Sequence, residues 1–496
     1  MKKISIAFIG FALSAPSFVS AQSDIDALRY SQSYLTGTAR YVGLGGAFGA
    51  LGADFSALSD NPGGIGLYRK SEFTFTPSIT SEQSTSQFLS QAGSDNKFNF
   101  NIGNLGLVFT KPLSRDNTSD GWKSINFAIG YNRLADFNTR TSYQGVNNNN
   151  SYLDYILQGA NGTATQNLDQ FYQNLAYQTY LIDTTYDNNH YRSVIPYAGE
   201  LQRRSSETSG SSGEVVISLG ANYGNRLYIG GTLGIDYLNY TENTNYQELD
   251  PNNTIPDFNS FTLAQNLITT GVGVNFKFGM IFSATDWLRL GAAVHTPTFY
   301  SMHDDYSNTM TSTFDDGTSY VWSSPQGSFD YSLATPFKAI GSAAFIIGKM
   351  GLVSADYEYV DYSNMDLSSS SIPGAFFDVN NTIHQKYTAT GNIKLGTEWR
   401  IATVYRVRAG YDLFGSPFAS GEAIPGADQA KTAYSVGFGV RDKGFSVDLA
   451  YAYSITHDYV QEYSLFNPTN NTPISVPGAI NKIETNNFLL TLGFRF

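Results

Sequence analysis

From Ser71 onward the sequence is a succession of segments in which large apolar residues alternate with small or polar ones. Between 271 and 280, every even position is Val, Phe or Met, whereas the odd positions are Gly, Asn or Lys. Successive side chains of a β-strand point to opposite faces, so each segment predicts a strand with one apolar and one small or polar face. We identify fourteen such strands, at about 71–80, 97–110, 122–133, 213–224, 226–241, 264–283, 286–300, 328–347, 350–364, 386–400, 404–414, 430–441, 444–457 and 485–496.

The charged residues indicate that these strands close into a membrane barrel. Arg406, Arg408 and Asp412 share the face opposite Tyr405 and Val407, so the inner face carries mixed charges beside small residues. Short turns alternate with long polar segments, as in outer-membrane barrels with short periplasmic turns. The sequence predicts an all-β, fourteen-stranded antiparallel transmembrane β-barrel; a water-soluble β-sandwich is the alternative. The predicted long loops are 81–96, 134–212, 242–263, 301–327, 365–385, 415–429 and 458–484.

The two ends of the chain indicate export to the outer membrane of a Gram-negative bacterium. Residues 1–21 combine two lysines, an apolar run and a small-residue cleavage site, which is typical of a secretory signal peptide. The last strand ends in Phe496, an aromatic C-terminus that predicts recognition by the barrel assembly machinery. We therefore expect a signal peptide at 1–21, an N-terminal hatch, or plug, at 22–70, and a multi-pass barrel with long extracellular loops at 71–496. The loop 134–212 is expected to form a partly helical cap over the outer mouth.

The segment 38–68 is too rich in Gly and Ala to form a core of its own. It contains Gly45, Gly46, Phe48 and Phe55 and ends in a turn-forming run of Asn61, Pro62, Gly63 and Gly64. Something larger must hold such a segment, which is why we expect it to plug the barrel. Phe48 and Phe55 are expected to pack the hatch first and to touch a solute second.

Four short stretches resemble the hatch of the FadL/TodX family of outer-membrane transporters of hydrophobic compounds. They are Gly37 to Arg40, Gly45 to Phe48, Asp54 to Ala57, and Asn61 to Gly64, although Gly63 stands where that family usually has Ala. The segments LGAAVHTPT from Leu290 and SADYEYVDYS from Ser354 are also similar to the family. The resemblance implies a hatch-plugged barrel that admits long-chain fatty acids or aromatic compounds passively, with a lateral opening in its wall. The alternative function is a non-transporting barrel that anchors or shuttles components of a secretion or surface-assembly complex.

One predicted strand changes phase in a way that fits such an opening. Phe98, Phe100 and Ile102 occupy even positions, whereas Leu105 and Leu107 occupy odd ones. The slip falls at Gly103 and Asn104, where a bulge would break strand pairing. An ordinary bulge that only helps to close the barrel explains the slip equally well.

Five basic residues on predicted inner faces are candidates for contact with a solute. A carboxylate head group could bind the lysines and arginines, but their pairing with barrel and hatch carboxylates, which would seat the plug, is the favoured interpretation. For His295 the favoured role is structural hydrogen bonding. The candidates are Lys277, His295, Lys394, Arg406 and Arg408, and the proposed acidic partners are Glu398, Asp412, Asp448, Asp54 and Asp60.

Other functions find little support in the sequence. The net charge of −12 disfavours nucleic-acid binding, the glycines at 43–49 do not follow a buried strand as a dinucleotide loop would, and no catalytic constellation is recognisable. His303, Asp304 and Asp305 are interpreted as a solvated loop cluster and not as a metal site. We expect no enzyme activity and no cofactor, and as partners a hydrophobic small-molecule ligand, outer-membrane lipid and lipopolysaccharide, and the assembly machinery.

Overall fold

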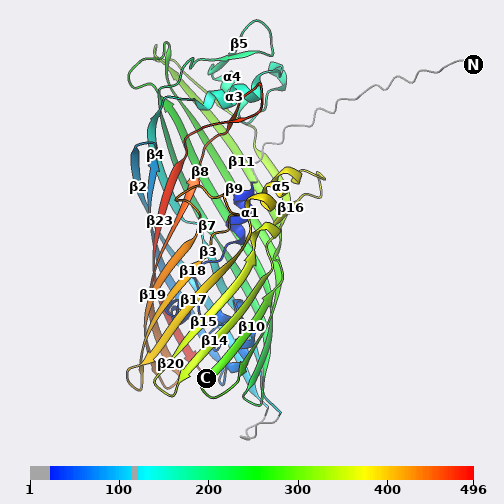
Figure 1. The fold of residues 1–496 in the computed structure, drawn as a ribbon, viewed down its shortest axis with the longest axis vertical. Helices are drawn as coiled ribbons and strands as arrows, with labels where there is room; N and C mark the ends of the chain where they lie inside the picture. Colours follow the sequence, from blue (N-terminus) through cyan, green and yellow to red (C-terminus); the bar gives the residue numbers. More distant parts are fainter. Residues whose placement is uncertain (1–22, 114–120) are drawn as a thin grey trace, which may run out of the picture.

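The computed structural model describes residues 23–113 and 121–496, so the predicted signal peptide lies outside the described part. The strands form a single antiparallel sheet that closes on itself, because the first strand pairs with both the second and the last (Figure 1). The wall has fourteen strands, as predicted. No helix in the described residues is both long and apolar enough to cross a membrane.

The wall strands are β1 (Glu72–Phe88), β2 (Gln91–Pro112), β3 (Trp122–Asp136) with its continuation β4 (Thr139–Asn147), β7 (Glu200–Tyr223), β8 (Leu227–Leu249), β9 (Phe258–Ser283), β10 (Leu288–His295) with its continuation β11 (Phe299–Phe314), β13 (Gly327–Ala334) with its continuation β14 (Lys338–Ile347), β15 (Gly351–Asp361), β17 (Ala389–Arg400), β18 (Tyr405–Phe414), β19 (Lys431–Asp442), β20 (Phe445–Val460) and β23 (Ala479–Arg495). Two strands are interrupted at Pro297 and Pro336, where proline offers no N–H to the ladder.

The alternation predicted from the sequence separates the outside of the barrel from its inside. On β9, Val272 and Phe276 are 59% and 50% exposed, whereas Asn275 and Lys277 between and beside them are buried. Apolar side chains therefore face outward, where lipid surrounds an outer-membrane barrel, and small or polar side chains face the lumen.

The strands extend further toward the outer end than the sequence indicated. The predicted loop 81–96 is wrong, since β1 and β2 continue to a tight turn at Leu89 and Ser90. Likewise β8 and β9 leave only 250–257 between them, and β12 (Ser319–Ser323) forms a hairpin with β11. These extensions are rich in Ser, Thr and Asn on both faces, so they lack the apolar alternation by which strands were recognised.

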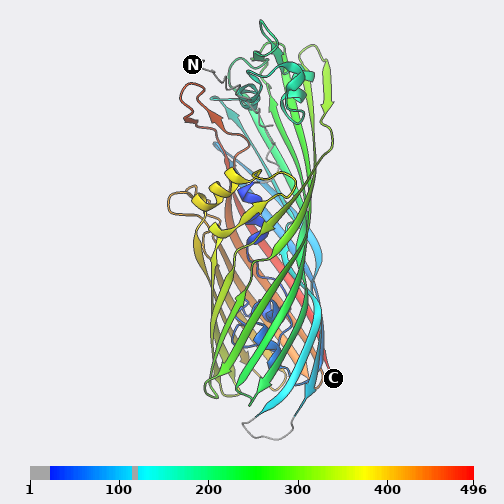
Figure 2. The same ribbon diagram turned by 90° about the vertical axis from the view of Figure 1, so that its right-hand side faces the viewer.

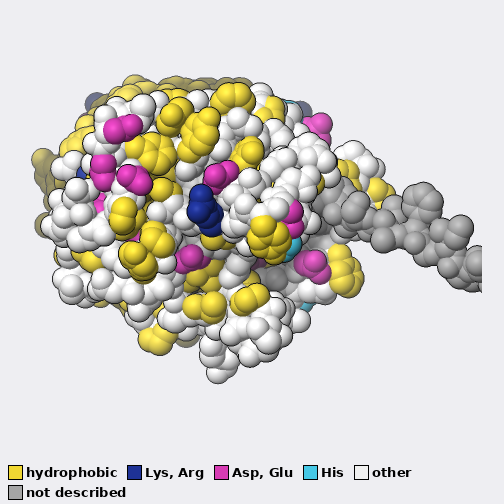
Figure 3. All heavy atoms as spheres, turned by 90° about the horizontal axis from the view of Figure 1, so that it is seen from above, with side chains coloured by type: hydrophobic (Ala, Val, Ile, Leu, Met, Phe, Trp, Pro, Cys, Tyr) yellow, Lys and Arg dark blue, Asp and Glu magenta, His cyan; other side chains and the backbone are white. Residues whose placement is uncertain are grey.

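The middle of the predicted loop 134–212 forms a helical cap at the outer end, but both ends of that range are wall strands, because β4 covers 139–147 and β7 begins at Glu200. Here α3 (Tyr152–Ala160) and α4 (Gln173–Gln178) lie at the top of Figure 1, with η3 (Thr165–Asn167), β5 (Ile182–Thr184) and β6 (Tyr191–Ser193). Leu153 and Leu175 pack against Phe258 and Phe261 in one buried cluster. Seen from above, acidic side chains are spread over this end among hydrophobic ones (Figure 3).

The remaining outer segments hold small elements. The structure has β16 (Asp366–Ser368), which pairs with β13, the short 3-10 helix η4 (Tyr362–Asn364), α5 (Phe377–Lys386), and the pair β21 (Leu465–Phe466) and β22 (Pro473–Ile474). Tyr387 forms an isolated bridge with Phe418.

The N-terminal segment lies inside the barrel, as predicted for a hatch (Figure 2). It forms α1 (Asp24–Ser31), α2 (Ala39–Gly43), η1 (Ser56–Ser59) and η2 (Pro62–Leu67). A capping box between Ser23 and Asp26 begins α1. In Figure 1, α1 lies near mid-height and the rest of the hatch lies below it, toward the short turns.

Candidate functional site

The glycines of the hatch allow its backbone to lie directly against the wall. Gly45 and Gly46 have φ angles of +60° and +66°, which favour glycine. A Cβ at Gly45 would lie 2.9 Å from the backbone nitrogen of Tyr411, and one at Gly63 would lie 2.7 Å from Cα of Met280. At position 63, where the resembling family has alanine, the backbone of this hatch lies too close to β9 for a Cβ to fit without a shift.

The end of the hatch is fixed by Asn61 and Pro62. The Oδ1 atom of Asn61 accepts a hydrogen bond from the Gly63 N–H at 2.9 Å, and its Nδ2 donates to the carbonyls of Gly49 (2.6 Å) and Met280 (3.1 Å). Pro62 begins η2, where its fixed φ and missing N–H cost nothing. One side chain thus connects two parts of the hatch to strand β9.

Phe48 and Phe55 are fully buried, so both pack the hatch in this structure. The Phe48 ring stacks on Tyr41 with centroids 5.4 Å apart, and the Arg40 guanidinium lies 5.1 Å from its centroid. Phe55 fills space left by the glycines Gly106 of β2 and Gly130 of β3.

Ion pairs join the hatch to the wall. Lys394 Nζ lies 3.1 Å from Asp60 Oδ2, and the Tyr41 hydroxyl also donates to Asp60. Arg40 Nε lies 3.3 Å from Glu398 Oε2, the same oxygen that accepts from Arg408 Nε at 2.6 Å. The structure therefore brings Lys394 and Arg408 into the network that seats the hatch.

The other three predicted lumen residues, Lys277, His295 and Arg406, differ in their contacts. Lys277 pairs with Glu214, a partner that the sequence did not suggest, and His295 Nε2 lies 2.6 Å from the carbonyl of Asp60. Arg406 is half-buried, and its Nη1 has no hydrogen-bond partner among the described residues. Four of the five candidates therefore contact protein groups in this structure: Lys394, Arg408 and His295 belong to the contacts between hatch and wall, and Lys277 pairs within the wall.

Two of the proposed acidic partners do not meet a basic wall residue. Asp54 accepts from the Thr38 hydroxyl at 2.8 Å and from the Ser56 N–H at 3.1 Å, so it organises the hatch itself. Burial raises the pKa of Asp54, although the Arg40 guanidinium and these hydrogen bonds oppose the shift. Neither carboxylate oxygen of Asp412 has a hydrogen-bond partner within the described ranges.

The wall has the break that the phase slip indicated. Between β1 and β2 the register passes from Thr76 opposite Asn104 to Pro77 opposite Ile102, which leaves Gly103 as an unpaired bulge. The β2–β3 ladder begins at Asn104 and runs to Pro112, toward the short-turn end of the barrel. No described residue between Gln91 and Gly103 therefore pairs with β3 or β4. A Cβ at Gly103 would lie 2.9 Å from the carbonyl oxygen of Gly37 in the hatch. The outer part of β2 therefore has no backbone hydrogen bonds to β3 or β4, and the hatch borders the bulge at the inner end of this gap.

Side chains bridge this gap, and the sequence analysis missed them. Asp136 Oδ2 accepts from Asn99 Nδ2 at 2.7 Å, from Asn101 Nδ2 at 3.3 Å and from Arg133 Nη2 at 3.0 Å. Higher up, Lys97 Nζ donates to the carbonyl of Thr208 at 2.6 Å. Polar residues of a barrel strand carry no sequence signal for such cross-gap bonds, because their partners are distant along the chain.

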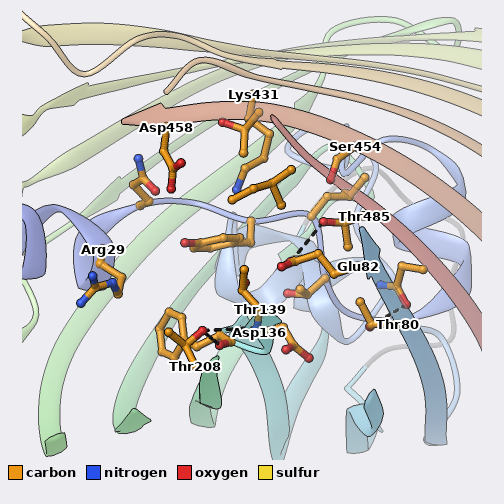
Figure 4. Close-up of a pocket in the computed structure, with 18 of the residues that line it drawn as sticks. Arg29, Thr80, Glu82, Asp136, Thr139, Thr208, Lys431, Ser454, Asp458 and Thr485 are labelled. Atoms are coloured by element: carbon orange, nitrogen blue, oxygen red, sulfur yellow. Dashed lines mark hydrogen bonds between the residues drawn. The ribbon is translucent and has the colours of Figure 1, made fainter. Parts of the chain in front are cut away.

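A cavity of about 290 Å³ lies in the lumen between the N-terminal part of the hatch and the wall (Figure 4). Its lining includes Leu35 and Gly37 of the hatch, Gly103 of the bulge, and Glu82 and Lys431 of the wall. A smaller cavity of about 140 Å³ lies among Asp60, Lys277, His295 and Lys394. The larger cavity is therefore the one that connects the interior with the break in the wall.

Comparison with known proteins identifies what the chain is similar to. The profile of the family described as "Outer membrane protein transport protein (OMPP1/FadL/TodX)" matches residues 32–473. A Pseudomonas aeruginosa FadL homologue has a similar structure, with 14% identity, a TM-score of 0.57, and coverage of 94% of this chain and 99% of that one. The P. putida toluene transporter TodX has 13% identity and a TM-score of 0.54, with coverage of 93% and 99%. These structures show the same fold, and a comparison with curated proteins found no match.

Proposed function

This chain belongs to the OMPP1/FadL/TodX family of outer-membrane transport proteins, and we propose that it lets hydrophobic small molecules cross that membrane passively. The solutes would be long-chain fatty acids or aromatic compounds, which are captured at the outer side, held between the hatch and the wall, and released through the wall at Gly103. One observation carries this proposal: the lumen cavity ends where the β2–β3 ladder is missing.

The physical reason for a lateral exit is the energetics of an apolar solute. Burial from water stabilises such a solute by about 0.8 kcal/mol per methylene, so it would not readily leave an apolar site for water on the periplasmic side. A fully hydrogen-bonded wall would also confine it. A gap beside Gly103 instead leads into the bilayer, where the solute loses little of this stabilisation.

The proposal gives the chain a transport role and no catalytic one. Several further parts of it rest on the sequence and on general barrel physics. They are a signal peptide at 1–21, recognition of the strand ending at Phe496 by the assembly machinery, contact of the outward apolar band with membrane lipid, and contact of the outer end with lipopolysaccharide.

A substitution at the bulge tests the proposed exit. Gly103→Val places a branched side chain against the Gly37 carbonyl and fills the gap, so uptake of a fluorescent fatty acid into proteoliposomes should fall several-fold. The matched control is Gly341→Val on β14, where a Cβ would have nothing within 4 Å. Both proteins should still migrate as folded barrels on unheated gels.

Unchanged uptake by a folded Gly103→Val protein would remove the support for a lateral exit. A wild-type barrel that admits no apolar solute, and that instead copurifies with other envelope proteins, would favour the alternative role of an anchor or shuttle.

A further inference from the structure

The charged groups that line the larger cavity are not all satisfied by each other. Arg204 Nε pairs with Glu462 at 2.7 Å, and Arg133 pairs with Asp136 at 3.0 Å. In contrast, Lys431 forms no ion pair with any described carboxylate, and its Nζ lies 3.7 Å from the centroid of the Tyr34 ring. Buried oxygens of Glu82 and Asp458 also lack a hydrogen-bond partner in the described residues.

These three groups come from neighbouring strands that line one side of the cavity. β1, β23, β20 and β19 are consecutive neighbours in the wall, and Glu82 is opposite Thr485, Asp458 opposite Asn481, and Lys431 opposite Thr456. Figure 4 shows Lys431, Glu82 and Asp458 around the same cavity. Lys431 is opposite Thr456, only two residues before Asp458 on the neighbouring strand, so a head group beside Lys431 meets an ammonium donor with a carboxylate acceptor near it.

The cavity changes character with depth. Leu489 follows Thr485 by four residues along β23, or roughly 13 Å at the rise of a β-strand, toward the hatch. Leu489, Leu35, Gly37 and Gly103 line this deeper end, beside the break in the wall. The deeper end therefore offers apolar side chains from Leu35 and Leu489, while Asn101, Arg133 and Asp136 keep the edge of the break polar.

We propose that the cavity selects amphiphiles whose head group both donates and accepts hydrogen bonds, such as hydroxylated aromatics, over hydrocarbons of the same size. This inference rests on the proposed transport function and names its solute class. A hydroxyl can donate to Glu82 or Asp458 and accept from Lys431, while the apolar part points to Leu489 and Gly103. A bare hydrocarbon would displace water from the Lys431 ammonium and from the unpartnered oxygens of Glu82 and Asp458 without replacing its hydrogen bonds, which is costly.

The test compares toluene with 4-methylphenol, which differs from it by one hydroxyl. Binding is measured by equilibrium dialysis of the full chain in lipid nanodiscs, with empty nanodiscs to subtract partitioning into lipid. We expect the wild-type protein to bind 4-methylphenol about tenfold more tightly or better, because hydrogen bonds to charged groups are the stronger ones. The double variant Lys431→Met with Glu82→Gln should lose most of this preference, whereas Lys349→Met, in an exposed turn, should keep it.

Each result has a distinct meaning. Equal binding of the two probes by the wild type, or a preference that survives the double variant, overturns the inference and leaves the transport proposal intact. A wild type that binds neither probe and admits no fatty acid in the liposome assay overturns both. The double variant should migrate as a folded barrel on unheated gels, which shows that a lost preference is not due to misfolding. Lys431→Arg, which keeps the positive charge, should retain the preference for 4-methylphenol.

Discussion

The ion pair between Lys394 and Asp60 gives the sharpest test of how the hatch is held. The two side chains retain only 8% and 16% exposure, and their charged atoms are 3.1 Å apart. Lys394→Met leaves Asp60 largely buried without its cation, and removal of one partner from a buried pair typically costs about 3–5 kcal/mol. The remaining exposure and the Tyr41 hydroxyl, which still donates to Asp60, favour the lower end of this range.

The expected loss can be measured as access to a buried hatch residue. The chain has no cysteine, so Ala57→Cys, at a fully buried position of η1, introduces a single thiol. If labelling by a water-soluble maleimide requires the hatch to open, a loss of about 3 kcal/mol should accelerate labelling by roughly a hundredfold, since each 1.4 kcal/mol is a factor of ten. Lys349→Met serves as the matched control and should leave the rate unchanged.

A double variant separates the pair from a general loss of stability. Adding Asp60→Asn to Lys394→Met removes the unpaired carboxylate, so labelling should slow again toward the wild-type rate. Equal labelling rates for the wild type and Lys394→Met would refute the reasoning. It would also be refuted if the double variant lost as much free energy of hatch closure as the two single variants together.

Three further substitutions follow from the same structure. Asp136→Asn removes the charged acceptor that links Asn99, Asn101 and Arg133 across the gap, so fatty-acid uptake should rise several-fold, whereas Asp286→Asn in a short exposed turn should not change it. Gly49→Ala would overlap the Ser342 hydroxyl, so it should reduce the yield of folded barrel, and Ser342→Gly in the same chain should restore that yield. Leu153→Ala removes a buried side chain from the cap, at a typical cost of about 2–5 kcal/mol, and should expose α3 and α4 to limited proteolysis while the barrel stays intact.

The sequence predicted the wall well because lipid imposes a simple rule on it. Wherever a strand crosses the apolar region, one face must be apolar, and the pattern from Val272 to Phe278 states this directly. Beyond the apolar region neither face of a strand has to be apolar. The outer halves of β1 and β2 are rich in Ser, Thr and Gln, so these paired strands were predicted to be a loop. The outer strand ends were therefore missed where polar extensions follow the apolar pattern, as in β1 and β2, but were found within three residues in β17, β18 and β19.

The candidate site was only partly predictable, for a different reason. The bulge at Gly103 could be predicted because the apolar alternation changes phase within one strand. The hatch glycines could be predicted because they are clustered within one segment. Ion partners such as Glu214 for Lys277, or Asp136 for Asn99, lie tens of residues away in the sequence and meet only once strand register is fixed. Lys431 was missed because it lies at the first positions of the predicted strand 430–441. The alternation there does not indicate that its side chain enters the lumen without an acidic partner among the described residues.

The position of Gly37 links the hatch to the proposed exit. Its φ of +129° favours glycine, and a Cβ there would lie 2.5 Å from the Ser56 hydroxyl, while its carbonyl oxygen borders the bulge at Gly103. The next residue, Thr38, caps α2 and hydrogen-bonds to Asp54, so the segment beside the gap is fixed to the body of the hatch. The hatch stretch that begins Gly-Thr-Ala-Arg therefore borders the wall where strand pairing fails. A displacement of the hatch toward the periplasm would move the Gly37 carbonyl away from Gly103 and so uncover the lumen side of the gap through which we propose that the solute leaves.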